Sequence, residues 1–169
     1  EPHAGGDEMG SAAAGWHDVR DTDLAELRRR VHVLPQESFL FSDTLGANLR
    51  LCAPEASDAE LEAALEKAAA GELLARLADG LETRVGDRGA TLSGSQRQRV
   101  CLARALLADA YILILDDATS ALDARTERRA IDNIRRLRKD GGRPLTMLIV
   151  ASRLSTARNA DRVVLLSGG

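Results

Sequence analysis

Residues 92–99 read LSGSQRQR and residues 111–117 read YILILDD, and these two stretches are the strongest indication of the fold. The first is the serine-led, glycine-containing start of a helix. The second is an apolar strand that ends abruptly in two carboxylates. The start of a helix presents unpaired N–H groups to phosphate, and carboxylate oxygens are hard ligands that suit Mg²⁺. Together the two stretches predict a site that contacts a nucleotide from one side and its metal ion from the other.

The composition of the 169 residues is that of one globular domain, because 44% are hydrophobic and 29% are charged. A formal net charge of −3 and an aromatic content of 2% argue against a nucleic-acid partner. Cys52 and Cys101 lie far apart without metal-ligand spacing, so we expect two structural thiols in a reducing compartment. No apolar run approaches the roughly 20 residues of a spanning helix, and we expect no signal peptide.

Hydrophobic periodicity and capping residues predict helices that alternate with short strands. Gly86–Gly89 is expected to be a turn, and residues 43–105, nearly all helical, are expected to form an inserted lobe. The strands at 111–115 and 146–151 are apolar throughout, which predicts burial on both faces of a parallel sheet. The expected strands are 31–34, 111–115, 146–151 and 161–166. Three of the expected helices have a predicted cap: 24–30 is capped by Asp23, 44–50 by Asp43, and 59–70 by Ser57 or Asp58. Three more are expected from about 73 to Gly80, from the LSGSQ stretch to about 108, and from Asp123 to about 140.

The order of five motifs resembles the nucleotide-binding domain of ATP-binding cassette (ABC) transporters. A chance match to one motif would be weak, but five in order at family-like spacing are specific. The motifs are Pro35-Gln36 for the Q-loop, Leu92–Gln96 for the signature, Ile112–Asp116 for Walker B, Ser120–Asp123 for the D-loop and Ala151–Ser155 for the switch segment. Residues 83–89 and 37–45 further resemble the exporters of this family.

The resemblance implies an α/β fold, namely a P-loop NTPase core with a parallel sheet and an inserted α-helical subdomain, whose N-terminal P-loop part is missing. Residues 1–15 are expected to be a flexible lead-in, and 16–169 a partial nucleotide-binding domain. Within that domain, residues 36–105 would form the helical and signature subdomain. Residues 106–169 would form the core from Walker B to the switch loop.

The resemblance also implies roles for individual residues. Gln36 and Asp116 would bind Mg²⁺, and Asp123 would contact the opposing subunit. Ser93, Gly94, Ser95 and Gln96 would face the γ-phosphate of an ATP held by that subunit, although Ser95 stands where the family more often has glycine. Each residue also has an ordinary structural interpretation: a capped helix, a strand-end aspartate or an exposed loop amide.

The catalytic positions depart from the family pattern. Asp117 stands where hydrolytic subunits carry glutamate, and losing one methylene withdraws the carboxylate by roughly 1.5 Å. General-base catalysis is worth on the order of 10²–10⁴-fold, so we expect most of it to be lost. Ser152 occupies the position of the switch histidine, and its hydroxyl can neither reach as far nor carry charge.

No Gly-x-x-x-x-Gly-Lys-Ser/Thr loop occurs in the sequence, whose only lysines are Lys67 and Lys139. We therefore expect a fragment or a truncated product, and no ATPase activity in the isolated chain. In the first case it would belong to the degenerate-site subunit of an exporter at the cytoplasmic face of the cell membrane, and would donate its signature to a partner. The partners would be a second nucleotide-binding domain, in a heterodimer in preference to a homodimer, and a transmembrane domain. The alternative is a non-enzymatic remnant that no longer binds ATP.

Overall fold

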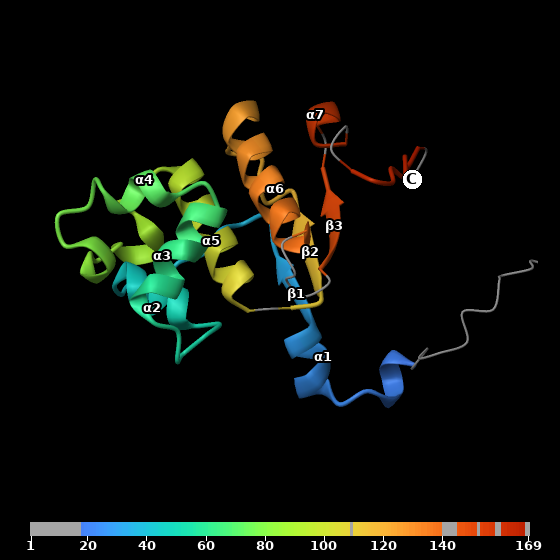
Figure 1. The fold of residues 1–169 in the computed structure, drawn as a ribbon, viewed down its shortest axis with the longest axis horizontal. Coiled ribbons are helices and arrows are strands. Elements are labelled where there is room, and N and C mark those ends of the chain that lie inside the picture. The colour runs from blue at the N-terminus through green and yellow to red at the C-terminus, as the bar shows by residue number, and fades with distance from the viewer. Residues whose placement is uncertain (1–17, 109, 140–144, 152, 158–159, 168–169) are drawn as a thin grey trace, which may run out of the picture.

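Three parallel strands form the sheet, in the order β1 (Val31–Leu34), β2 (Ile112–Asp116) and β3 (Thr146–Val150). The computed structural model describes residues 18–108, 110–139, 145–151, 153–157 and 160–167. In register, Val33 pairs with Ile114, which pairs with Leu148 on its other side. Helices separate the strands along the chain, so the predicted α/β fold with a parallel sheet is confirmed (Figure 1).

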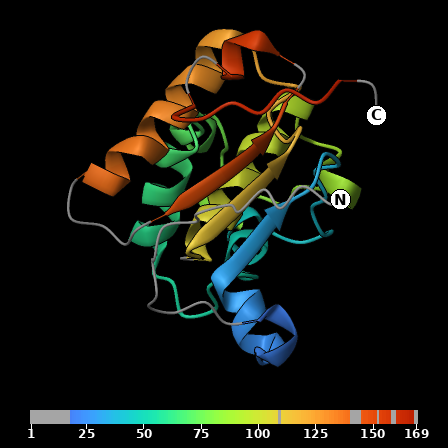
Figure 2. The same ribbon diagram turned by 90° about the vertical axis from the view of Figure 1, so that its right-hand side faces the viewer.

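Helices of the described part of the chain cover one face of the sheet. Figure 2 shows the sheet from its other side, with α5 (Gly94–Leu107) and α6 (Ala124–Lys139) behind it. The side chains of a strand alternate between its faces. Leu113 and Leu115 therefore point toward the helices and are 1% and 0% exposed, whereas Ile112 is 38% exposed and Leu148 is 55% exposed. The prediction of burial on both faces was wrong, because no described element lies on the second face.

The helices before the signature pack together to one side of the sheet (Figure 1). Their shared core consists of leucines at helical spacing, all of them at most 2% exposed: Leu45, Leu49, Leu61, Leu65, Leu73 and Leu102. The elements of this lobe are α2 (Leu45–Arg50), α3 (Asp58–Lys67), α4 (Gly71–Leu74), the 3-10 turns η2 (Gly80–Glu82) and η3 (Asp87–Gly89), and α5. Since α5 also contacts β1, it joins the lobe to the sheet.

Most predicted helix starts are confirmed by their caps. Asp23 caps α1 (Leu24–Arg30), which follows the 3-10 turn η1 (Val19–Asp21), and Ser57 caps α3 through a capping box with Glu60. The cap of α2 is Thr44 rather than Asp43, because the Thr44 hydroxyl accepts the N–H of Ala47 at 3.1 Å.

Two helix ends and one strand were predicted wrongly. The helix expected to reach residue 70 ends at Lys67, because Ala69 adopts a left-handed φ of 55°. The helix expected to reach Gly80 is the single turn α4. Residues 161–166 form no strand in the described structure, and the side chain of Leu166 is 89% exposed. An extended segment becomes a strand only when a neighbouring strand accepts its hydrogen bonds, and none of the described strands does. The last helix is α7 (Leu154–Ala157).

None of the helices in the described residues combines the length and the apolar character that a membrane crossing requires.

Candidate functional site

The first part of the site lies at the carboxyl edge of the sheet, where polar residues follow β1 and β2. The amide nitrogen of Gln36 donates a hydrogen bond to Asp117 Oδ2 at 3.2 Å, although the two residues lie 81 positions apart. The backbone N–H of Asp117 donates to the carbonyl of Val150 at the end of β3, at 3.0 Å. Asp117 is therefore fixed by contacts from the ends of both neighbouring strands. The structure thus brings together two residues that the sequence predicted for one site.

The backbone of Asp117 is itself unusual, with a left-handed φ of 47°. This conformation costs an L-residue about 1–2 kcal/mol, and aspartate adopts it more readily than most residues. Strained backbone of this kind clusters at functional sites. The strain lies at the position where the sequence departs from the motif pattern that it otherwise resembles.

Asp116 is the last residue of β2 and is exposed at the same edge of the sheet. The described residues contain no group of three or more His, Cys, Asp or Glu side chains that could hold a metal ion alone. Mg²⁺, however, is usually bound by one or two carboxylates together with phosphate oxygens and water. Asp116 and the amide oxygen of Gln36 fit such a partial donor set, because the Gln36–Asp117 bond uses only the amide nitrogen. Their role as metal ligands remains a prediction.

The second part of the site is the start of α5, where the predicted Ser93 cap is confirmed. The Ser93 hydroxyl accepts the N–H of Gln96 at 3.2 Å, and Gln96 Oε1 accepts the N–H of Ser93 at 2.7 Å. This capping box leaves the N–H groups of Gly94 and Ser95 without an acceptor in the helix. They are the groups that an external phosphate would bind.

The charge at the start of α5 also suits an anion. The first turn of α5 contains no acidic residue, whereas the first turn of α3 contains Asp58 and Glu60. Both helices are closed by a capping box, but the box of α3 carries a carboxylate and that of α5 a neutral amide. The partial positive charge of about half a unit at the N-terminal end of α5 is therefore not offset by an acidic residue of the same helix.

Gly94 is not required by packing inside the chain. A Cβ atom at this position would come no closer than 3.8 Å to its nearest neighbour, the Cβ of Ala121. This distance is an ordinary van der Waals contact, so a side chain at position 94 would not clash with the chain. The hydroxyl of Ser95 lies 3.2 Å from that of Ser93, so the residue that replaces the family's glycine points toward the cap.

The turn before α5 holds the signature in place through Arg97. Its Nη1 donates to the carbonyl of Leu92 at 2.7 Å and to that of Gly89 at 3.4 Å. Gly89 has a left-handed φ of 72°, and a Cβ there would lie 2.9 Å from Arg97 Cδ and 3.0 Å from Leu40 Cδ1. The predicted turn at residues 86–89 is confirmed, and its close packing sets the position of Ser93.

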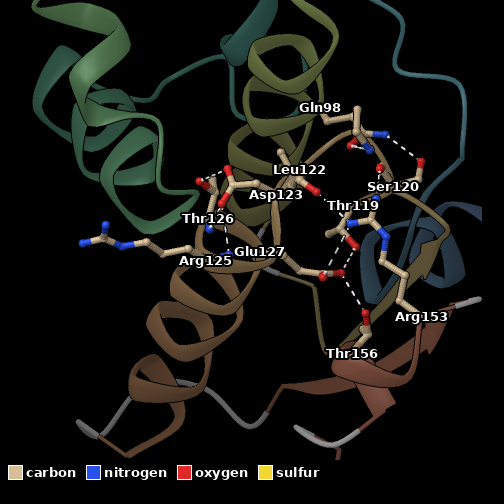
Figure 3. A network of polar contacts seen from close by, with 11 residues as sticks. Gln98, Thr119, Ser120, Leu122, Asp123, Arg125, Thr126, Glu127, Arg153 and Thr156 are labelled. Carbon is tan, nitrogen blue, oxygen red and sulfur yellow. Dashed lines mark hydrogen bonds and ion pairs between the residues drawn. The ribbon is translucent and has the colours of Figure 1, made fainter.

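Gln98 on α5 holds the loop that follows Asp117 through hydrogen bonds, and the sequence analysis did not predict this role. Gln98 is 6% exposed, and its amide donates to Ser120 Oγ at 3.2 Å and accepts the N–H of Ala121 at 2.9 Å (Figure 3). The available signal was a polar residue at a helix position that faces the core. Gln98 connects the signature helix to the loop of residues 119–123.

Asp123 caps α6 as predicted. Its carboxylate accepts the N–H groups of Arg125 and Thr126, both at 3.0 Å, and the Thr126 hydroxyl at 2.6 Å. The hydrogen bonds from Thr126, the largest contribution, and from Arg125 lower the pKa of Asp123 below its ordinary value. A contact of Asp123 with a second domain remains a prediction. Ser152, the other predicted catalytic residue, lies outside the described residues.

The segment after Gln36 is fastened to the second half of α5. Arg104 Nη2 donates to the carbonyl of Phe39 at 3.0 Å, and the thiol of Cys101 lies 3.5 Å from the same oxygen. Cys101 is buried and Cys52 half-buried, both are free thiols, and burial raises the pKa of each. Burial, and to a lesser extent the charge of Arg104, lower the pKa of His32 on β1. One helix thus supports the signature at its start and the Gln36 segment near its end.

The two parts of the site are separate in the chain. No hydrogen bond or ion pair among the described residues joins Ser93–Gln96 to Gln36, Asp116 or Asp117.

Comparisons with known proteins agree with the motif order. The family model described as "ABC transporter" matches residues 6–120. The chain is 40% identical over 162 residues to "Iron-sulfur clusters transporter ATM1, mitochondrial" of Candida glabrata, covering 96% of this chain and 22% of that protein. It is 44% identical over 153 residues to "ATP-dependent lipid A-core flippase" of Syntrophus aciditrophicus, covering 90% of this chain and 25% of that protein.

A solved structure, "Structure of a bacterial Atm1-family ABC exporter with ATP bound", matches with a TM-score of 0.72 and 42% identity over 81% of this chain and 23% of that one. The chain spans a quarter or less of the length of the two curated relatives named above.

Proposed function

The chain belongs to the ABC transporter family, and on that premise we propose that it forms part of the nucleotide-binding domain of an exporter. ATP hydrolysis in such a domain would drive transmembrane transport. The observation that carries the proposal is the start of α5. Ser93 caps it, a neutral capping box closes it, its first turn contains no acid, and a Cβ at Gly94 would come no closer than 3.8 Å to its nearest described neighbour.

In this proposal the start of α5 binds the γ-phosphate of an ATP held by a second nucleotide-binding domain. The free N–H groups of Gly94 and Ser95 would donate to the phosphate oxygens, and the Ser93 hydroxyl would hold the helix in position. Each part of the site is then completed by another polypeptide segment.

At the sheet edge, Gln36 and Asp116 would hold Mg²⁺, which when bound neutralises charge on the phosphate oxygens. Asp117 would be a weak general base. Its carboxylate is about 1.5 Å shorter in reach than a glutamate, and it already accepts a hydrogen bond from Gln36. We therefore propose that the site containing Asp117 and Ser152 is the degenerate one of a pair, and that the signature serves the active one.

The proposed partners follow from this division of labour. A second nucleotide-binding domain, most simply one with an intact catalytic glutamate, would hold the ATP that this signature contacts. A transmembrane domain would couple hydrolysis to transport, with the described residues at the cytoplasmic face of the membrane. One of the two relatives is named as a transporter and the other as a flippase, with different substrates, so the proposal names no substrate.

The experiment adds a carboxylate at matched positions of two helices. Ser95 and Ala59 are both the second residue of a helix that a serine capping box closes. In the complete transporter, Ser95→Asp should lower ATPase kcat on the order of 10²–10³-fold, because the new charge repels the phosphate where donors are needed. Ala59→Asp should leave kcat unchanged. Neither variant should lower the unfolding temperature, since an acid in the first turn stabilises a helix by about 0.3–1 kcal/mol.

The alternative function, a remnant that contacts a partner without ATP, predicts a different result. Ser95→Asp and Ala59→Asp would then have equal effects on turnover and on the binding of the partner. That outcome would refute the proposed role of the signature.

A further inference from the structure

The loop of residues 119–123 is held by side chains from α5, α6 and the segment of residues 153–156 (Figure 3). Arg153 Nη1 donates to the carbonyl of Leu122 at 2.7 Å, and Nη2 donates to the carbonyl of Ser120 at 2.5 Å. Two nitrogens of one planar guanidinium thus bond two carbonyls of the same loop. This geometry fixes both the position and the orientation of the loop, because a rigid fork cannot rotate without breaking one bond.

The guanidinium is placed in turn by a buried carboxylate. Glu127 on α6 is 3% exposed, and its Oε2 lies 3.9 Å from Arg153 Nη1. Its other oxygen accepts the hydroxyls of Thr119 at 2.5 Å and Thr156 at 2.8 Å. A buried carboxylate is costly unless it is paired and hydrogen-bonded, and here both conditions are met. Glu127 on α6 therefore contacts both the start of the loop and the segment of residues 153–156.

We propose that Arg153 and Glu127 are positioning residues that lock the loop of residues 119–123 to the segment that follows position 152, so that the two move as one unit. Arg153 and Thr156 attach that segment at two points to the loop and to α6. A displacement of Arg153 would be transmitted to the carbonyls of Ser120 and Leu122. It would reach the cap of α6 at Asp123 in the same step.

This inference rests on the proposed function, because it assigns a coupling role between the switch position and a loop expected to face the second domain. It adds two residues that contact neither nucleotide nor metal. Their effect would be on the geometry of the composite site, and hence on kcat rather than on ATP affinity.

The test uses the complete transporter and two arginines that each bond an acceptor across the fold. Arg153→Gln removes both bonds to the loop, whereas the control Arg135→Gln removes an ion pair from α6 to Asp161 that does not touch the loop. Arg153→Gln should lower kcat on the order of 10–100-fold with KM within about twofold, as expected for a misplaced catalytic geometry. Arg135→Gln should change neither constant.

Arg153→Lys separates positioning from charge neutralisation. Lysine keeps a positive charge near Glu127, but its single nitrogen cannot occupy the positions of both Nη1 and Nη2. The unfolding temperature should therefore recover while kcat stays low. Recovery of kcat together with the unfolding temperature would mean that Arg153 only neutralises Glu127, and the inference would be overturned.

The double variant Glu127→Gln/Arg153→Gln guards against loss of folding. It removes the buried carboxylate together with its cation, so no unpaired buried charge remains. Its kcat should fall as in Arg153→Gln. A kcat equal to that of the unsubstituted transporter would overturn the inference.

Hydrogen exchange provides a readout that does not depend on turnover. The amides of Ala121 and Leu122 are bonded to Gln98 and Thr119, and those bonds require the loop to keep its shape. Exchange at residues 120–122 should rise by roughly tenfold or more in Arg153→Gln and stay unchanged in Arg135→Gln. Unchanged exchange in both would overturn the inference even if Ser95→Asp confirmed the proposed function. Faster exchange with no effect of Ser95→Asp would instead count against the proposed function alone.

Discussion

Replacing Gly89 by alanine tests whether close packing of the turn before α5 sets the position of the signature. Alanine introduces two separate costs at this position. The first is backbone strain, because φ is +72°. The second is steric, because the new Cβ would lie 2.9 Å from Arg97 Cδ and 3.0 Å from Leu40 Cδ1, and Leu40 is fully buried.

Gly80 offers a matched control within the same lobe. Its φ is +53°, but a Cβ at that position would meet nothing within 4 Å. Gly80→Ala therefore carries the strain alone, about 1–2 kcal/mol. Gly89→Ala adds overpacking of about 1–3 kcal/mol, which gives about 2–5 kcal/mol in total.

The assay is thermal and urea unfolding of the 169-residue chain followed by circular dichroism. For a chain of this size, 1 kcal/mol shifts the unfolding temperature by roughly 2–4 °C. We expect a loss of about 2–8 °C for Gly80→Ala and about 4–20 °C for Gly89→Ala, with unchanged m-values. Equal losses in the two variants would refute the reasoning, because the contacts with Arg97 and Leu40 would then contribute nothing.

Three further outcomes are expected. Ser93→Ala and Ser57→Ala should each lower the free energy of unfolding by about 1 kcal/mol, because each removes one capping-box hydroxyl, but only Ser93→Ala should reduce turnover of the complete transporter. The pKa of His32 is lowered from 6.5 in the folded chain. As the pH drops below about 6.5, the unfolded chain therefore binds a proton before the folded chain does, and the free energy of unfolding should fall. Urea unfolding of His32→Gln at pH 7.5 and 5.5 should show a smaller difference than the unsubstituted chain. Asp117→Glu should raise single-turnover ATP hydrolysis on the order of 10²-fold in a transporter whose other site is disabled, because it restores the reach of the base.

Each of these three predictions has a result that would contradict it. A loss of turnover in Ser57→Ala as large as in Ser93→Ala would show that the Ser93 cap of α5 affects turnover only through the stability of the protein. An unchanged pH dependence in His32→Gln would assign the effect to other groups. Unchanged hydrolysis in Asp117→Glu would place the defect elsewhere than in the length of the side chain.

The sequence predicted the local features well, because each depends on atoms only a few residues apart. Ser57, Ser93 and Asp123 cap the helices that were expected to begin there, since a cap binds N–H groups two or three residues ahead. The sequence also placed Gln36 and Asp117 at strand ends in one site, because ligands of parallel sheets bind at the carboxyl ends of the strands, whereas their direct hydrogen bond came only from the structure.

Features that depend on distant partners were missed or predicted wrongly. The apolar residues of β2 and β3 indicated burial on both faces, but burial depends on what else packs against the sheet, which a strand's own sequence does not state. The early end of α3 at Lys67 was missed because Ala69 carries no signal for a left-handed φ.

The family, the alternation of helices and strands, and the capped start of α5 could all be inferred from the sequence, because each is encoded in short runs of residues. Only the tertiary structure decided that Gln98, Glu127 and Arg153 grip one loop. Arg153 lies 31 and 33 positions from the carbonyls it binds. Every residue has a backbone carbonyl, so the sequence does not show which carbonyl a side chain will bind. The choice of such acceptors is made by the folded chain, because only folding brings the guanidinium within reach of them.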